Sequence, residues 1–440
     1  MKKDEIYAIL NDWNLWNHRL KTGTERPVYL CKLRSILPSG QVAVITGPRR
    51  SGKSFVMRQL AQGLVDNGLP ANQVLLVNFE DPRLSPLDVG LLQEIFETYL
   101  EYMRPAGKPY IFLDEIQEVD QWEKWVRTMH ELNKAVIVIS GSNAKLLSTE
   151  LSTVLTGRHL DARILPLSFS EFLSFNDLNL REQNDIVLNQ SRVNGLWHDY
   201  LSNGGFPETV GSDNKKEILF HYFEDLAEKD LARRYHLRKS EKIKELARFY
   251  LSNTARPTTF TSVGKFLGVT AATAERFSRY LENAFLCFFL RRFSFTVKEQ
   301  TKSPRKVYSV DTGLSRAVGF ESSPNIGWHA ENAVFLELLR RQSDNPDLEL
   351  FYWKDVQHHE VDFVLKEKER VTQLIQVVWD MSNSKVRERE KKNLLKVMAE
   401  LKCDSGLVLT SDFAGEEVVG GVKVVYRTMK DWLLFGGQYR

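Results

Sequence analysis

Residues 47–54 read GPRRSGKS, a short stretch with two glycines, two arginines and a lysine. It matches GxxxxGK(S/T) between a β-rich segment, residues 41–46 (QVAVIT), and a segment with apolar residues at helical spacing, residues 55–67, as is typical of a P-loop. The glycines let successive backbone N–H groups curl around a phosphate, and the start of the helix adds positive potential. We therefore predict that Lys53 reaches the β and γ phosphates of ATP and that Ser54 ligates Mg²⁺. The residues predicted to contact the nucleotide are Gly47, Pro48, Arg49, Arg50, Ser51, Gly52, Lys53, Ser54 and Phe55.

A second motif, residues 110–115 (YIFLDE), predicts the carboxylates that complete this site. Its apolar part reads as a buried strand that delivers Asp114 and Glu115 beside the loop. Asp114 can hold the Mg²⁺ shell, and Glu115 can polarise the attacking water. A strand-end turn or a helix cap is the structural alternative for this acidic pair. A kinase of small molecules could use the same loop, but a Glu directly after the Asp favours water as acceptor, so the predicted reaction is ATP hydrolysis.

Alternating strand and helix patterns surround both motifs and predict a parallel α/β sheet over about the first 165 residues. Each expected strand is short, apolar and followed by a segment with helical spacing. The expected strands are residues 41–46, 74–79, 110–113, 135–140 and 162–165, and helices are expected at residues 55–67, 122–132 and 145–156.

These first 165 residues resemble the core of an AAA+ ATPase. The resemblance implies a homo-oligomer, such as a hexamer, in which Ser142 or Asn143 senses the γ-phosphate. It implies that Arg158 reaches the nucleotide of a neighbouring subunit, where the alternative is an ordinary surface arginine. It further implies that Asn78, at the end of its strand, is a polar partner of Glu115.

Beyond residue 165 the strand pattern stops and helical spacing takes over. Residues 205–207 interrupt these helices and resemble a lid motif through which Pro207 would approach the nucleotide; a helix-breaking turn is the alternative. Residues 261–268 and 270–284 read as two short helices joined by a tight turn, and a strand-like segment, residues 286–295, follows them. This order is typical of a winged helix, which could bind DNA or pack as a spacer.

The last part of the chain shows the order α-β-β-β-α-β after residue 328, which is similar to the core of restriction-endonuclease-like nucleases. The resemblance implies that Asp362 on the second strand and Glu331 on the first helix are metal ligands. The third strand departs from the (D/E)xK pattern, because Gln376 stands where Glu is expected and Val378 replaces the lysine. An amide oxygen is a weaker ligand for hard metals than a carboxylate. We therefore expect a degenerate site without intact nuclease chemistry.

Over nearly its full length the chain resembles prokaryotic, especially archaeal-type, ATPases that carry a C-terminal domain of unknown function. The resemblance implies ATP hydrolysis and suggests DNA as a partner. The predicted domains are an AAA+ core (residues 1–165), a helical lid (166–240), a winged helix (241–300) and a degenerate nuclease-like domain (301–440).

Charge is close to balanced over the whole chain, with 60 Lys and Arg against 57 Asp and Glu, so no global field indicates a nucleic-acid partner. Basic side chains nevertheless gather locally. They number 8 against 4 acidic ones in residues 228–248, 6 against 1 in residues 291–306 and 7 against 3 in residues 385–402. These patches favour DNA as the partner of the C-terminal half.

Three widely spaced cysteines, acidic residues near the N-terminus and the lack of a long apolar run favour a cytoplasmic protein with no membrane partner. The favoured function is Mg²⁺-dependent ATP hydrolysis by an oligomeric AAA+ ATPase, coupled to binding or remodelling of duplex or branched DNA. One alternative is an ATP-dependent signalling or defence switch that acts on a protein partner. The other alternative is an ATP-regulated nuclease.

Overall fold

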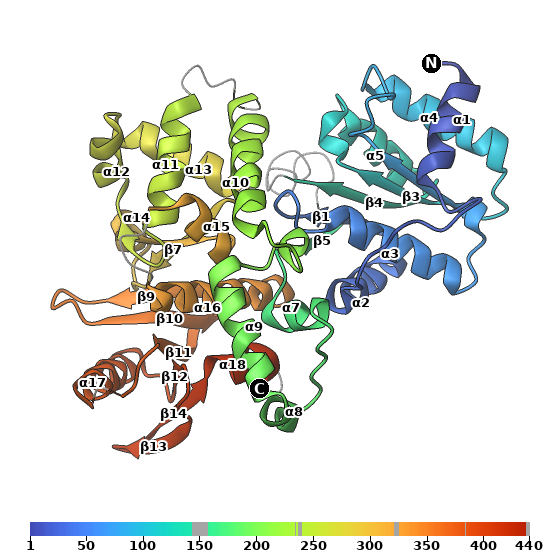
Figure 1. Ribbon diagram of the computed structural model, residues 1–440. Helices are drawn as coiled ribbons and strands as arrows, with labels where there is room; N and C mark the ends of the chain where they lie inside the picture. The colour runs from blue at the N-terminus through green and yellow to red at the C-terminus, as the bar shows by residue number, and fades with distance from the viewer. Residues whose placement is uncertain (143–156, 234, 236–239, 321–324, 383, 437–440) are drawn as a thin grey trace. The chain divides into compact units, whose positions relative to one another are not determined.

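The computed structural model describes residues 1–142, 157–233, 235, 240–320, 325–382 and 384–436 (Figure 1). Contacts divide the chain into two compact units, Met1–Ile164 and Leu165–Arg440. Each unit has its own β-sheet. None of the described helices is both long and apolar enough to cross a bilayer.

The first unit is built on the predicted parallel sheet, whose five strands have the order β2-β3-β4-β1-β5. The strands are β1 (Val42–Thr46), β2 (Val74–Asn78), β3 (Tyr110–Asp114), β4 (Val136–Gly141) and β5 (His159–Arg163). The α/β prediction for this region is therefore confirmed. The prediction for β5 was wrong at its start, which lies at His159 rather than at residue 162. β5 is an edge strand whose first three residues are partly or fully exposed, so it lacks the apolar run that marks the central strands.

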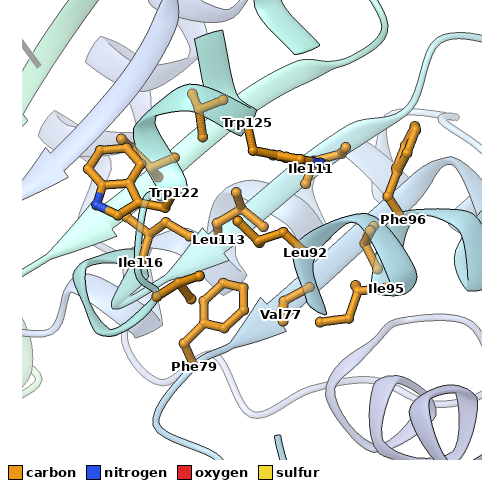
Figure 2. Packing of buried hydrophobic residues seen from close by; sticks show 14 of the residues in the cluster. Val77, Phe79, Leu92, Ile95, Phe96, Ile111, Leu113, Ile116, Trp122 and Trp125 are labelled. Carbon is orange, nitrogen blue, oxygen red and sulfur yellow. The ribbon is translucent and has the colours of Figure 1, made fainter. Parts of the chain in front are cut away.

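Helices cover both faces of this sheet (Figure 1). They are α1 (Lys3–Trp13), α2 (Pro27–Ile36), α3 (Lys53–Asp66), α4 (Val89–Met103) and α5 (Trp122–Glu131). Successive strand residues point to opposite faces, so Val77 packs in the core under α1, α4 and α5, whereas Leu76 packs in the core under α2 and α3. Figure 2 shows the first of these cores, whose members include Phe96, Ile111, Leu113 and Trp125. The helix predicted at residues 145–156 lies outside the described residues.

The second unit begins with helices and a short 3₁₀ turn, η5 (Pro207–Thr209). As predicted for this region, no strand lies among its described residues up to 252. The helices are α7 (Phe169–Phe175), α8 (Gln183–Leu188), α9 (Gln190–Asn203), α10 (Lys215–Asp225), a π-helical segment (Leu226–Arg233) and α11 (Ser240–Ser252).

Two short helices, α12 (Phe260–Leu267) and α13 (Ala271–Asn283), follow within one residue of the predicted bounds. Gly268, with φ +65°, ends α12, and the Thr270 hydroxyl caps α13 by accepting a hydrogen bond from the Thr273 backbone N–H. Three strands lie next to them in the unit's large sheet, β6 (Pro257–Thr258), β7 (Cys287–Arg292) and β8 (Arg305–Ser309).

The remainder of the unit extends this sheet to nine strands in the order β13-β14-β12-β11-β10-β9-β7-β8-β6. The further strands are β9 (Leu348–Lys354), β10 (Glu360–Glu367), β11 (Arg370–Val378), β12 (Ser405–Thr410), β13 (Gly415–Val419) and β14 (Val422–Thr428). The further helices are α14 (Val297–Lys302), α15 (Thr312–Val318), α16 (Ile326–Asp344), α17 (Ser384–Leu401) and α18 (Met429–Phe435). The predicted order α-β-β-β-α-β is observed from α16 to β12. Because Arg291 in β7 pairs with Phe351 in β9, the sheet runs across the predicted boundary between residues 300 and 301.

Candidate nucleotide-binding site

The loop between β1 and α3 has the backbone of a phosphate cradle. Gly47 has φ +146°, and a Cβ at this position would lie 2.0 Å from the Ile164 carbonyl oxygen, so only glycine fits. Gly52, with φ +96°, ends the loop, and α3 begins at Lys53. The unpaired N–H groups of the first helical turn and the helix dipole make this end of α3 suited to an anion.

Lys53 forms a buried ion pair with Glu115 at the end of β3. Its Nζ lies 3.3 Å from Glu115 Oε1 and donates a hydrogen bond to the Pro48 carbonyl oxygen at 3.2 Å. The Lys53 and Glu115 side chains are only 4% and 7% exposed. Burial opposes the charge on Glu115, but Lys53 and Arg49 outweigh it and hold the pKa of this carboxyl below its ordinary value. Glu115 is therefore an ionised carboxylate, oriented by a 2.5 Å hydrogen bond from Gln117 Nε2 to Oε2.

Asp114 lies beside Glu115 and faces the start of α3. Its carboxylate accepts hydrogen bonds from Ser54 and from Ser140, the latter on β4. Ser140 Oγ also accepts a hydrogen bond from the Glu115 backbone N–H at 3.1 Å, so one side chain ties β4 to both acidic residues. Burial and the neighbouring Glu115 raise the pKa of Asp114, against these hydrogen bonds. Asp114 and Ser54 are thus held together, as a shared Mg²⁺ site requires.

Two buried hydroxyls at the same edge of the sheet have no hydrogen-bond partner among the described residues, Thr46 Oγ1 and Ser142 Oγ. Thr46 ends β1 and pairs in register with Gly141, the residue before Ser142. Both residues are at most 1% exposed. Buried polar groups in native proteins almost always have partners, so these two hydroxyls fit phosphate oxygens or a bound water. Asn143, the other predicted sensor, lies outside the described residues.

Three neighbours of this site were not identified from the sequence: Gln117, Ser140 and Arg26. The buried Arg26, just before α2, donates from Nη1 to the Ser51 carbonyl oxygen at 2.7 Å and so supports the loop from behind. Phe55, a predicted nucleotide contact, is 45% exposed and packs its ring against Gly23. Ser140 could have been found as the polar residue at the end of an apolar strand, but nothing in the loop motif points to Arg26.

Asn78, the predicted partner of Glu115, ends β2 and pairs in register with Asp114. Its side-chain Oδ1 accepts a hydrogen bond from the Glu80 backbone N–H at 3.0 Å. The amide that bonds Glu115 in this structure belongs to Gln117 instead. The role of Asn78 therefore stays a prediction.

Arg158 lies at the opposite edge of the sheet from the loop. Its carbonyl oxygen accepts a hydrogen bond from the Val42 N–H at the start of β1, and at about 3.3 Å per strand residue the loop begins roughly 16 Å away. Its half-exposed guanidinium forms a 2.7 Å ion pair with Glu131. Arg158 is therefore separated from the nucleotide site of its own chain, and its action on a neighbouring subunit stays a prediction.

Pro207 begins η5 in the second unit, after the glycine pair that ends α9. A Cβ at Gly204 would lie 2.0 Å from Asp311 Oδ1, and the Gly205 N–H donates to Asp311 Oδ2 at 2.6 Å. Burial raises the pKa of Asp311 to about 6. Close packing against Asp311 therefore explains why a glycine occupies position 204, without any contact to nucleotide. The approach of Pro207 to nucleotide stays a prediction.

The structure also brings together Glu331 on α16 and Asp362 on β10, the two carboxylates predicted for the nuclease-like site. A buried lysine lies between them: Lys306 Nζ donates to Glu331 Oε1 at 2.9 Å, to Asp362 Oδ1 at 2.8 Å and to Glu360 Oε1 at 2.7 Å. Burial and the neighbouring Asp362 raise the pKa of Glu331 to about 7, although Lys306 acts in the opposite direction. Lys306 was not identified from the sequence, because β8 lies outside the predicted element order, and Glu360 was not singled out as a site residue.

Gln376 on β11 lies beside this carboxylate cluster and lines the same cavity as Glu360 and Asp362. Its Oε1 accepts a hydrogen bond from the Asp362 backbone N–H at 3.2 Å, and its Nε2 donates to Glu390 Oε2 at 3.1 Å. Within the described parts of the chain, no three His, Cys, Asp or Glu side chains are arranged to hold a metal ion.

Family models match three consecutive parts of the chain. One described as an AAA domain matches residues 39–173. Two described as domains of unknown function, DUF8612 and DUF4143, match residues 194–325 and 326–427.

Two curated proteins match most of the chain. An uncharacterized protein of Methanocaldococcus jannaschii is 33% identical over 376 residues, 83% of this chain and 80% of that protein. An uncharacterized protein of Haemophilus influenzae is 30% identical over 427 residues, 94% of this chain and 99% of that protein. Among solved structures, the Walker-type ATPase PABY2304 of Pyrococcus abyssi matches with a TM-score of 0.44 and 13% identity, covering 69% of this chain and 99% of that one.

Proposed function

The chain belongs to the same protein family as the Methanocaldococcus jannaschii and Haemophilus influenzae relatives, its first unit is an AAA-type ATPase domain, and we propose that it hydrolyses ATP in a Mg²⁺-dependent reaction. The observation that carries this proposal is the convergence of Lys53, Ser54, Asp114 and Glu115 at one edge of the parallel sheet. Lysine, hydroxyl, metal-binding carboxylate and water-orienting carboxylate are the groups that phosphoryl transfer to water needs.

The residues present fit a nucleotide and a magnesium ion. The loop at Gly47 leaves no room for a side chain, and two buried hydroxyls, Thr46 and Ser142, lie at the same edge. The Ser54 hydroxyl and the Asp114 carboxylate supply oxygen donors of the kind that Mg²⁺ prefers. When bound, Mg²⁺ supplies charge neutralisation on the phosphate oxygens.

The chain's own side chains divide the work. Lys53 binds phosphate oxygens, and the first turn of α3 directs its N–H groups at them. Glu115, ionised and oriented by Gln117, accepts a hydrogen bond from the attacking water and aligns it. Ser140 holds both acidic residues in place, because its hydroxyl donates a hydrogen bond to the Asp114 carboxylate and accepts one from the Glu115 backbone N–H.

The proposal extends to self-assembly and to DNA. Arg158 is supported as a residue that acts between subunits by its half-exposed position far from its own site. An arginine that reaches the nucleotide of a neighbouring subunit, called an arginine finger, raises the rate of hydrolysis roughly 10³- to 10⁵-fold. ATP turnover would therefore rise when subunits assemble. DNA is supported only by the local excess of basic residues, and several of these are paired internally, as Lys244 is with Glu224.

Steady-state ATP turnover with and without Mg²⁺ tests the proposal. We expect Mg²⁺-dependent turnover that Lys53→Ala abolishes, whereas Lys134→Ala, at an exposed lysine of the same unit, leaves it unchanged. Equal turnover in both variants would refute the assignment of the site. Adding duplex, forked and junction DNA at low salt tests the DNA partner, and mass measurement with and without ATP tests assembly. If no DNA changes the rate of ATP turnover, the alternative function is favoured, namely an ATP-dependent signalling or defence switch that acts on a protein partner.

A further inference from the structure

The second unit contains a lysine ammonium completely surrounded by acidic side chains. Lys306 is 1% exposed, and its Nζ lies 2.9, 2.7 and 2.8 Å from carboxylate oxygens of Glu331, Glu360 and Asp362. An ammonium group has three N–H donors, so each donor has one carboxylate. The lysine is fully satisfied without any further ligand.

The backbone places these groups by simple periodicity. Glu360 and Asp362 are two residues apart on β10, so they share one face of the sheet. Lys306 and Tyr308 are likewise two apart on β8, and the Tyr308 hydroxyl donates to Glu331 Oε1 at 2.7 Å. The cluster therefore joins β8, β10 and α16.

The second oxygens of two carboxylates are held from outside the cluster. Lys354 Nζ contacts Glu360 Oε2 at 2.7 Å, and the Val377 backbone N–H donates to Asp362 Oδ2 at 3.0 Å. These contacts fix each carboxylate with one oxygen aimed at the point that the Lys306 Nζ occupies. Carboxylate oxygens are the ligands that a hard divalent cation prefers, although with Lys306 in place these three are not arranged to hold one.

A cavity lies on one side of this cluster. A cavity of about 1030 Å³ is lined by residues that include His359, Glu360, Asp362 and Lys391. The side chain of Glu360 is 25% exposed, which is consistent with an opening on this side. Two of the three carboxylates, those of Glu360 and Asp362, therefore line a cavity that solvent ions can enter.

We propose that the Lys306 ammonium takes the place of a divalent cation in this carboxylate cluster. The wild-type protein then binds no divalent metal there, and ion pairs with Lys306 connect β8, β10 and α16 instead. Replacing Lys306 with an uncharged side chain leaves three converging carboxylates and creates a site for a cation such as Mn²⁺. This inference is independent of ATP hydrolysis, because every residue in it lies in the second unit.

Mn²⁺ binding to the full chain, measured without nucleotide by the loss of the free Mn²⁺ EPR signal, tests the inference. We expect Lys306→Met to bind one more Mn²⁺ than the wild type, at least tenfold more tightly than any site in the wild type. Adding Asp362→Asn to this variant should remove the extra ion. Lys302→Met, the same change at an exposed lysine on α14, should behave as the wild type does. Tight binding to the wild type that Asp362→Asn abolishes would overturn the proposal, as would an extra ion that survives Asp362→Asn.

Thermal unfolding covers the case in which Lys306→Met folds poorly. Mn²⁺ should raise the Tm of this variant by several degrees more than that of the wild type. The double variant Lys306→Met/Glu331→Gln has one negative charge fewer, so we expect it to fold without metal and to show a smaller rise. Lack of a metal-dependent rise in both variants would overturn the proposal.

Discussion

Replacing Lys53 with methionine should destabilise the first unit even before nucleotide is considered. Lys53 Nζ is 3.3 Å from Glu115 Oε1, both side chains are almost completely buried, and Asp114 is a second buried carboxylate next to them. Removing one partner of a buried ion pair typically costs about 3–5 kcal/mol, because the other charge stays buried. For a unit the size of Met1–Ile164, each kcal/mol shifts the Tm by about 2–4 °C, so we expect the Tm to fall by roughly 6–20 °C.

The double variant Lys53→Met/Glu115→Gln is the control that isolates the pair. In Lys53→Met the Glu115 carboxylate stays buried without its partner, whereas in the double variant this charge is removed as well. The double variant should therefore be more stable than Lys53→Met alone. The experiment is thermal unfolding at pH 7.5 without nucleotide, followed by intrinsic tryptophan fluorescence. A double variant that is as unstable as the single one would refute the reasoning, because the loss would then come from packing of the lysine stem.

The same pair predicts a pH dependence. The pKa of Glu115 is lowered in the folded protein, so the pair stabilises the fold above the ordinary Glu value of 4.5. This contribution is lost as the pH falls through the lowered pKa. In Lys53→Met the lowering by Lys53 is gone, so we expect burial to raise the pKa of Glu115, and the loss of stability relative to the wild type should shrink between pH 7.5 and 5.0 as Glu115 takes up a proton. A loss that is constant over this range would contradict the electrostatic account.

Three further substitutions test other parts of the site. Gly47→Ala should weaken binding of a fluorescent ATP analogue at least tenfold, because its Cβ would meet the Ile164 carbonyl; unchanged affinity would show that the loop can relax. Ser142→Ala should lower turnover at least tenfold while leaving the Tm equal or higher, since it removes a buried hydroxyl without a partner in the described structure; a fall in the Tm would mean that the hydroxyl is structural. Arg158→Ala breaks a half-exposed ion pair and should cost less than about 1 kcal/mol in urea unfolding, while turnover falls and ATP affinity does not; loss of affinity would place Arg158 in its own subunit's site.

The parts of the fold that could be predicted are those whose pattern is carried by residues close together in the sequence. The loop at residues 47–54 and the apolar strands of the first sheet can be recognised from neighbours in the chain. The polar edge strand β5 does not have this signal, and its start was predicted wrongly. The place of β4 between β1 and β3 was not predicted either, because strand order depends on contacts between distant segments.

The candidate site divides in the same way. Asp114 and Glu115 lie at the end of an apolar strand and were predicted, whereas Gln117 acts through a side-chain direction that only the folded chain defines. Lys306 is the clearest case. It lies 25 residues from Glu331 and 56 from Asp362 in sequence, and no periodicity links these positions. In the sequence Lys306 cannot be distinguished from an ordinary surface lysine, because its three carboxylate partners are brought together only by folding.

Mg²⁺-dependent ATP turnover and ATP affinity, measured on one preparation for the wild type and for Glu115→Gln, separate hydrolysis from nucleotide binding. We expect the variant to bind ATP as tightly as the wild type but to turn it over at least 100-fold more slowly, because removal of a positioned base costs about 10² to 10⁴ in rate. Glu118→Gln, at an exposed glutamate three residues along the chain, should match the wild type in both. Wild-type turnover in Glu115→Gln would contradict the account.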